Sequence, residues 1–399
     1  MIEKGRPNIR TRIRKRHLVY KTETFLIAGI CEGRTTTSID RGQQKNACQK
    51  ITAFLRSAKN QKYIANVTGV PAARVPIVKF IHIKTALSVD LSFRNPMAVL
   101  NTDFIRLCVE ADSRIRIVMI SIRYWASRNG LSGGGSRGWK FTNYALSMLI
   151  IFYLQVCTAQ CLKVVPKSLI NFYFQTEGIL PTAQFLIENL QPEESAIIDG
   201  WECGFSHDLS KWKQSLNKKS PLELLKGFFE YYANFDYENS VISPYAGMPI
   251  DKKEFLAGKT KTELPILKPY WDRIVNDDLD LLPTNSPVCI QDPFELNFCI
   301  TKGYYPGAFE VWKSSLSLTL ERLSSEDAPS SGLLAIFELP PIAKPENKKD
   351  RKIREKIEAK RENGSSGPHF RFALVASGKK ADLNQCIMQI FKDIMLVSK

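Results

Sequence analysis

The pattern of hydrophobic and polar positions in the first quarter of the chain predicts one helix followed by strands. Residues 45–60 carry apolar side chains at helical spacing. Three short apolar runs rich in β-branched residues follow, bounded by glycine and proline, at residues 64–67, 74–83 and 86–93. A helix followed by adjacent strands indicates a layer of the α/β or α+β kind.

From Asp103 onward, the pattern becomes helical. Apolar side chains recur at helical spacing in the segments 104–110, 115–127, 142–156 and 221–235. Thr142 is the expected N-cap of the third segment, and Pro221 stands at the start of the fourth, where proline is favoured. Residues 324–332 are rich in Ser, Asp and Pro and predict a linker. Residues 344–362 alternate in charge and predict a solvated helix or a disordered stretch, and 369–376 predicts a last strand.

Composition adds an excess of positive charge to this picture. The formal net charge is +16 and the sequence pI is about 9.4, which points to a polyanionic partner, either nucleic acid or an anionic membrane surface. The first 21 residues carry eight Lys or Arg and one Glu. Such an arm resembles a transit peptide, but it could equally be an internal segment of a longer protein.

The chain fits poorly with a membrane-spanning protein and with a protein built on a structural zinc site. The most apolar segment, 145–156, contains Ser147 and Gln155 and is shorter than the roughly 18 residues that a membrane span needs, so it predicts a buried helix without membrane insertion. The nine cysteines are scattered and form no C-x-x-C pair, which argues against a structural zinc site and fits buried thiols in a reducing compartment.

Asp90 is a carboxylate inside an otherwise apolar strand, in the run Ala86-Leu-Ser-Val-Asp-Leu-Ser-Phe93. Burying a carboxylate is costly unless it is ionised beside a cation or hydrogen-bonded. The alternative interpretation is an aspartate at the end of a strand that faces solvent.

Short motifs follow Asp90 in a fixed order. They are Asn101-Thr102, Asp112-Ser-Arg114, Ile122-Arg-Tyr-Trp-Ala126, Asn143-Tyr-Ala-Leu146, the helix 221–235 and Ile290-Gln-Asp-Pro-Phe-Glu295. In this order and spacing, they resemble the noncanonical poly(A) polymerases and terminal uridylyltransferases, whose catalytic domain is polymerase-β-like. The resemblance covers about residues 40–310. The strings at 138–143 and 223–236 resemble the mitochondrial poly(A) polymerases, while Asp199-Gly-Trp-Glu-Cys203 resembles the nuclear uridylyltransferases of small RNA at least as well.

The resemblance implies an α+β fold with an incomplete nucleotidyltransferase palm, a mixed sheet with helices, followed by an all-helical central domain. The expected boundaries are a basic arm at 1–22, a partial palm at 23–103, the helical domain at 104–323 and a linker with a charged tail at 324–399. A segment of the kind associated with poly(A) polymerases is expected at about 219–250, within the helical domain.

By the same resemblance, Asp90 is the third catalytic carboxylate and a metal ligand. Carboxylates of this family hold two Mg²⁺ or Mn²⁺ ions, which activate the RNA 3′-hydroxyl and steady the leaving pyrophosphate. The third carboxylate can also serve as the general base.

Five residues are expected to bind the incoming nucleotide. Asn101 and Thr102 match positions that contact the ribose, Arg123 matches a lysine on the triphosphate, and Asn143 matches a serine that binds phosphate or sugar. Tyr144 matches the aromatic residue on which the base stacks, an interaction of roughly 1–3 kcal/mol for any base. Other roles stay open for three of them: a helix N-cap for Asn101, a surface arginine for Arg123 and a core residue for Tyr144.

Phe298 bears on the choice of base. Uridylyl-adding relatives carry a histidine three residues after the glutamate that corresponds to Glu295, and this chain has Phe298 there. The difference favours ATP over UTP as the substrate.

The chain lacks the first part of the family's catalytic signature. A Gly-Ser pair followed by Asp-x-Asp is absent, and the one Asp-x-Asp in the chain, Asp278-Leu-Asp280, is expected in a solvated loop. The segment 25–34, where the pair should stand, contains only Glu32. Either the chain is a fragment or mis-joined gene model that begins after the catalytic strand, which we favour, or it is a pseudoenzyme.

The expected function is therefore template-independent addition of adenylates from ATP to RNA 3′ ends, in mitochondria or alternatively in the nucleus. This polypeptide alone is expected to be inactive. The alternatives are an RNA-binding pseudoenzyme of the same family and a terminal uridylyltransferase of small RNA. The resemblance leaves open whether the protein forms a homo-oligomer.

Overall fold

The chain forms two structural units in the computed structural model. The first comprises Met1–Glu32, Asp40–Asn95 and Ser365–Lys399, and the second comprises Gly33–Ile39 and Pro96–Gly364. The structure describes residues 25–28, 41–58, 60–61, 63–83, 87–92, 96–133, 138–156, 178–212, 215, 217–256, 264–324 and 371–375. The predicted basic arm at 1–22 and the charged segment at 344–362 lie outside these ranges.

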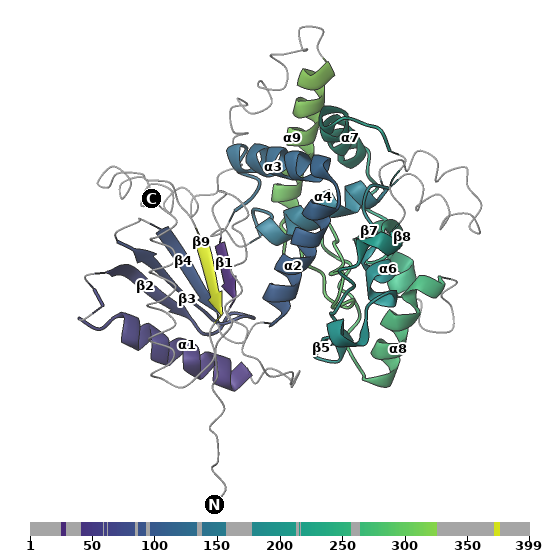
Figure 1. Ribbon diagram of the computed structural model, residues 1–399. Helices are drawn as coiled ribbons and strands as arrows, with labels where there is room; N and C mark the ends of the chain where they lie inside the picture. Colours follow the sequence, from purple (N-terminus) through teal and green to yellow (C-terminus); the bar gives the residue numbers. More distant parts are fainter. Residues whose placement is uncertain are drawn as a thin grey trace, which may run out of the picture. The chain divides into compact units, whose positions relative to one another are not determined.

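The first unit is built on a mixed sheet with a helix along one face (Figure 1). Its strands follow the order β1 (Phe25–Ala28), β9 (Arg371–Val375), β4 (Leu87–Ser92), β3 (Ile77–His82) and β2 (Ile64–Val70), and its helix is α1 (Arg41–Leu55). The predicted strands at 64–67, 74–83 and 86–93 are confirmed as β2, β3 and β4, which pair as antiparallel neighbours. β9 confirms the last predicted strand and runs parallel to both β1 and β4.

Side chains alternate across the two central strands of this sheet. Val78 and Phe80 on β3 are buried, as are their cross-strand partners Leu91 and Val89 on β4. Because successive side chains of a strand point to opposite faces, Lys79 and Asp90 share the other face, where they are direct cross-strand neighbours.

The second unit is mainly helical. Its helices are α2 (Pro96–Ala111), α3 (Ser113–Arg128), α4 (Asn143–Val156), α6 (Ala183–Glu188), α7 (Pro221–Ala233), α8 (Lys268–Asn276) and α9 (Pro306–Ser324). Two short hairpins accompany them, β5 (Ile197–Ile198) with β6 (Trp201–Glu202), and β7 (Ser240–Ser243) with β8 (Met248–Asp251). The expected α+β class and the four predicted helices are confirmed.

Two helix starts test the sequence analysis directly. Thr142 caps α4 as predicted, since its Oγ1 accepts a hydrogen bond from the Ala145 amide at 3.1 Å. The N-cap interpretation of Asn101 is wrong, because α2 begins at Pro96 and Asn101 lies within the helix. No helix in the described ranges is long and apolar enough to cross a membrane.

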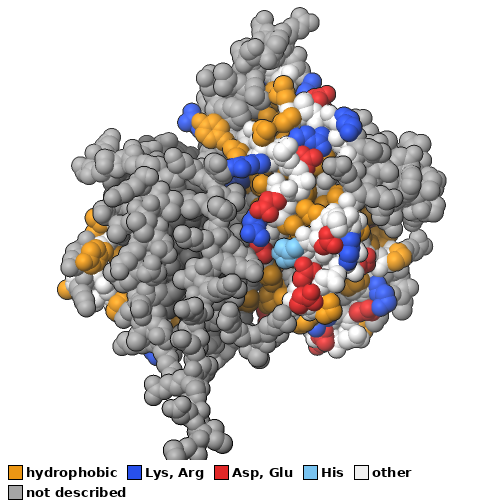
Figure 2. All heavy atoms as spheres, in the orientation of Figure 1, with side chains coloured by type: hydrophobic (Ala, Val, Ile, Leu, Met, Phe, Trp, Pro, Cys, Tyr) orange, Lys and Arg blue, Asp and Glu red, His pale blue; other side chains and the backbone are white. Residues whose placement is uncertain are grey.

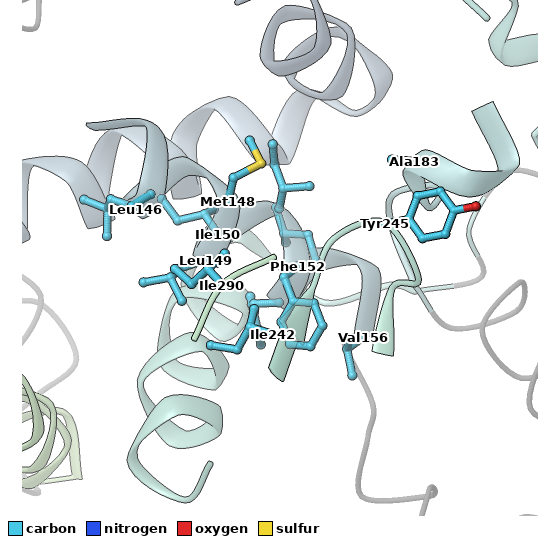
Figure 3. Packing of buried hydrophobic residues seen from close by; sticks show 14 of the residues in the cluster. Leu146, Met148, Leu149, Ile150, Phe152, Val156, Ala183, Ile242, Tyr245 and Ile290 are labelled. Atoms are coloured by element: carbon cyan, nitrogen blue, oxygen red, sulfur yellow. The ribbon is translucent and has the colours of Figure 1, made fainter. Parts of the chain in front are cut away.

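α4 forms the centre of the core of this unit, which confirms the buried helix predicted from its composition. Every side chain from Ala145 to Val156 is buried, as expected for a helix that is apolar all round. Figure 3 shows Ile242 and Ile290 beside this helix, and Tyr245 beside Ala183 of α6. The Nε2 of the polar Gln155 donates inside the core to the carbonyls of residues 181 and 244, at 2.9 and 3.0 Å.

Candidate nucleotide-binding site

Three segments of the second unit converge around a cluster of aromatic rings. Phe104 of α2 packs edge-on against Phe294, with 5.3 Å between the ring centroids, and against Phe205 at 5.6 Å. Phe205 and Phe294 stack on each other at 5.5 Å. All three rings are buried. The cluster therefore holds α2, which carries Asn101 and Thr102, against the loop 292–298.

Asp292 connects this loop to the start of α4. Its side chain is 3% exposed. Its Oδ1 accepts hydrogen bonds from the amides of Phe294 and Glu295, both at 3.0 Å, and its Oδ2 accepts one from the Tyr144 hydroxyl at 3.0 Å. Burial raises the pKa of Asp292 to about 6, and burial together with the Asp292 charge raises the pKa of Tyr144. Tyr144 therefore stays a neutral donor, and its ring is held in one orientation by the loop.

Phe298 closes the same loop. The Asp292 amide donates to the Phe298 carbonyl at 2.9 Å, and the Phe298 amide donates to the Glu295 carbonyl at 2.8 Å. The Phe298 ring is half-buried, and the Lys302 ammonium lies 6.0 Å from its centroid. Tyr144 and Phe298 are far apart in the sequence, but the structure attaches both to one loop.

The two predicted residues of α2, Asn101 and Thr102, differ in burial and in hydrogen bonding. Thr102 is exposed and its hydroxyl donates to the Ala98 carbonyl at 2.8 Å. The Oδ1 of Asn101 is buried and accepts no hydrogen bond within the described part of the chain. A buried acceptor without a donor is costly, so Asn101 is suited to accept a hydrogen bond from a hydroxyl or amide of a ligand. Asn143, the first residue of α4, is half-buried beside Tyr144.

The other two predicted site residues come from α3 and from the first unit. Arg123 is half-buried on α3, which packs against α2 and α4. Asp90 belongs to the first unit, whereas the other predicted residues belong to the second.

The residues that the structure describes around Asp90 do not fit a two-metal site. Asp90 is the sole Asp or Glu within the described strands β1, β2, β3, β4 and β9. Its Oδ2 is paired with the Lys79 ammonium at 2.8 Å. Two metal ions require several carboxylates at one place, and among the residues that the structure describes, no group of three His, Cys, Asp or Glu could hold a metal ion. Asp278 and Asp280 are exposed after α8, as the sequence predicted.

His207 is a part of this region that the sequence analysis missed. Its Nε2 lies 3.3 Å from Asp103 Oδ2 on α2, and its Nδ1 lies 3.1 Å from Glu194 Oε1. The hydrogen bond to Asp103 is the main cause that raises the pKa of His207, and the bond to Glu194 adds to it. Partial burial opposes both. The imidazolium therefore ties α2, at the residue directly after Thr102, to the loops that carry Glu194 and His207. No short motif signals this contact, because its three residues come from separate segments.

We expect His207→Gln to lower the melting temperature more at pH 6 than at pH 9. A histidine whose pKa is raised on folding stabilises the fold fully below its unfolded value of 6.5, and this stabilisation is lost as the pH rises through the folded value. The side chain is 43% exposed, so the expected difference is only about 2 °C. Thermal melts at both pH values measure it. Lys226→Gln, which removes a surface pair with Glu230, should show no such difference, and equal losses for His207→Gln at both values would contradict the assignment.

With this geometry in place, comparison with known proteins identifies two segments. Residues 24–110 match the family model of the central palm domain of poly(A) RNA polymerase, mitochondrial-like. Residues 223–298 match the model of the Cid1 family poly A polymerases, and this match ends on Phe298. Together they include the strand with Asp90, the α2 residues Asn101 and Thr102, and the 292–298 loop.

Curated relatives and solved structures agree with these models. The speckle targeted PIP5K1A-regulated poly(A) polymerase of Rattus norvegicus is 33% identical over 234 residues, which are 59% of this chain and 22% of that protein. The mitochondrial poly(A) RNA polymerase of Homo sapiens is 29% identical over 261 residues, which are 65% of this chain and 36% of that protein. The crystal structure of mtPAP in complex with ATPgammaS matches with a TM-score of 0.58 and 25% identity, covering 80% of this chain and 58% of that one.

Two segments of the chain, residues 24–110 and 223–298, therefore match domains of poly(A) polymerases. In sequence and in fold the chain is similar to poly(A) polymerases, as its sequence motifs indicated. The chain spans about a fifth to a third of the length of the curated relatives that it matches.

Proposed function

We propose that this protein takes part in template-independent addition of adenylates from ATP to RNA 3′ ends. The observation that carries the proposal is the Tyr144–Asp292 hydrogen bond, which fixes an aromatic ring beside the loop that bears Phe298. An oriented ring of this kind can stack on a base. The Asn101 Oδ1 supplies a buried acceptor on α2 for a ribose hydroxyl, and Arg123 keeps a positive charge on α3 for a triphosphate.

ATP is the proposed nucleotide because of Phe298. An apolar ring at this position provides no imidazole to hydrogen-bond a uracil edge, and its face offers contact area to the larger purine. Crystal structures of the relative mtPAP hold ATPgammaS, UTP, GTP or CTP. The test therefore has to compare all four nucleotides on this chain.

We expect ATP to raise the melting temperature of the chain more than UTP, GTP or CTP does at equal concentration. A ligand that binds only the folded form stabilises it in proportion to the logarithm of its concentration over Kd. We expect Phe298→His to shift the ratio of the ATP and UTP dissociation constants toward UTP by about tenfold, which is about 1.4 kcal/mol. Thermal melts over a series of concentrations of each nucleotide, with magnesium, measure both effects.

Phe54→His is the matched control for this experiment. Phe54 lies on α1 of the first unit and is 36% exposed, so its substitution should leave the nucleotide preference unchanged. Equal protection by all four nucleotides, with no change in Phe298→His, would refute the adenylate part of the proposal.

A second candidate function is an RNA-binding pseudoenzyme that keeps the nucleotide site. The ion pair between Asp90 and Lys79 favours it, because this pair uses the one carboxylate of the palm strands described. The two candidates predict the same nucleotide binding and differ in turnover. A mitochondrial location is proposed by similarity to the mitochondrial enzyme, and the speckle targeted relatives support the nuclear alternative.

A further inference from the structure

α3 has an exposed face that mixes apolar, aromatic and basic side chains. Ile117, Ile120 and Tyr124 are 54%, 41% and 48% exposed, although large apolar side chains are usually buried. Arg114 and Arg128 stand at the two ends of the same stripe, because positions 114, 117, 120, 124 and 128 are three or four residues apart. We call these five residues, Arg114, Ile117, Ile120, Tyr124 and Arg128, the α3 face. Where Figure 1 draws α3, Figure 2 shows hydrophobic side chains beside basic ones.

The charge around this face is strongly one-sided. Residues 113–128 contain four arginines and no Asp or Glu. Asp112, the N-cap, pairs with Arg114 at 2.7 Å. Arg114 also donates to the carbonyls of Asn217 and Lys219, at 2.9 and 2.8 Å. These bonds bring a second basic segment, with the exposed Lys218 and Lys219, to the N-terminal end of α3.

The composition of the face selects one kind of occupant. A protein groove that takes a helix presents a broad apolar stripe, whereas this face is apolar only at three positions between basic ones. A helix that lies on a membrane places tryptophan on its apolar side, and the tryptophan of α3, Trp125, is fully buried. Basic side chains that follow a phosphate backbone, combined with a ring on which a base stacks, are the pattern of single-stranded nucleic acid binding.

We propose that the α3 face binds the single-stranded RNA whose 3′ end is the substrate, with one base stacked on Tyr124 and Arg128 on a backbone phosphate. This proposal rests on the proposed function for the nature of the nucleic acid. Arginine is well suited to bind a phosphate, since its guanidinium can donate two parallel hydrogen bonds to one phosphate. The stretch from residue 114 to 128 spans about 21 Å at the helical rise, long enough for more than one nucleotide.

The test measures the binding of a 5′-fluorescein-labelled, mixed-sequence single-stranded RNA of 15 nucleotides to the full 399-residue chain by fluorescence anisotropy. We expect Tyr124→Ala to raise Kd about tenfold, because a stacked base is lost, and Tyr124→Phe to stay within about twofold, because the ring remains. Arg128→Gln should lower the slope of log Kd against log salt by about 0.7, the value for one phosphate on a single strand. Tyr63→Ala, at a tyrosine 49% exposed in the first unit, and Lys268→Gln, at a lysine 76% exposed on α8, are the matched controls and should change neither quantity.

Each other outcome overturns the inference in a distinct way. If the unmodified chain binds RNA and Tyr124→Ala binds it equally well, the RNA lies elsewhere and the proposed function stands. If Tyr124→Phe loses as much affinity as Tyr124→Ala, the stacking role is wrong. If the unmodified chain does not bind the RNA although ATP raises its melting temperature, the α3 face takes another partner and the RNA part of the proposed function also falls. Thermal melts of every variant show whether it is folded.

Discussion

With ATP, magnesium and an RNA that ends in a 3′-hydroxyl, this 399-residue chain is expected to add no adenylates at a measurable rate. Catalysis by two metal ions depends on carboxylates that hold both ions against the attacking and the leaving oxygen. The described strands of the palm sheet contain only Asp90, and Asp90 is paired with Lys79. Loss of a single charge-stabilising group costs roughly 10²- to 10³-fold in turnover, so two missing carboxylates should lower the rate by more than about 10³-fold.

Primer-extension assays on denaturing gels, with human mitochondrial poly(A) RNA polymerase run in parallel, would measure this rate. The decisive variant is Asp90→Asn. Asp90 and Lys79 are both partly exposed, and such pairs contribute less than about 1 kcal/mol, so the variant should fold normally. If the unmodified chain extended the primer and Asp90→Asn did not, a working metal site would exist and the prediction would be wrong. ATP should still raise the melting temperature of both proteins, which separates nucleotide binding from turnover.

Much of the fold was predictable, because local signals specified it. Regular apolar spacing gave the helices α3 and α7, and the runs rich in β-branched residues gave β2, β3 and β4. The pairing of β9 with β4 was not predictable, since the two strands are separated by almost the whole second unit and nothing in a short strand specifies its partner. The short hairpins, β5 with β6 and β7 with β8, were also missed because strands of two to four residues carry almost no periodic signal.

The candidate site, like the fold, was predictable from the sequence only in part. Tyr144 and Phe298 came from motif order, and the structure attaches both to one loop. The reason for their closeness, the buried Asp292 between α4 and the loop, could not be read from the sequence, where the residue is one letter of Asp292-Pro-Phe-Glu295. His207 was missed for a related reason, because its partners Asp103 and Glu194 come from distant segments. The roles of all the predicted site residues, Asp90, Asn101, Thr102, Arg123, Asn143, Tyr144 and Phe298, stay predictions.

The second large effect is expected for Trp125, the buried neighbour of the exposed Tyr124. Its ring packs edge-on against Phe229 of α7 and Trp312 of α9, with 4.8 and 5.8 Å between centroids, and its Nε1 donates to Thr319 Oγ1 at 2.9 Å. All of these groups are buried. Trp125→Ala should therefore remove packing among three helices and lower the free energy of unfolding by about 3–5 kcal/mol, which corresponds to a fall in melting temperature of about 10 °C.

Tyr124→Ala, one position earlier, is the matched control for this stability measurement. Tyr124 is 48% exposed, so the change in unfolding free energy should stay within about 0.5 kcal/mol. Trp125→Phe refines the argument, because it keeps an aromatic ring for Phe229 and Trp312 but leaves Thr319 without its indole donor. The expected loss is about 1–2 kcal/mol. Chemical denaturation followed by circular dichroism measures all three. If Trp125→Ala were no more destabilising than Tyr124→Ala, the two faces of α3 would be assigned the wrong way round, and the surface inferred to bind RNA would instead be the one that packs on α7 and α9.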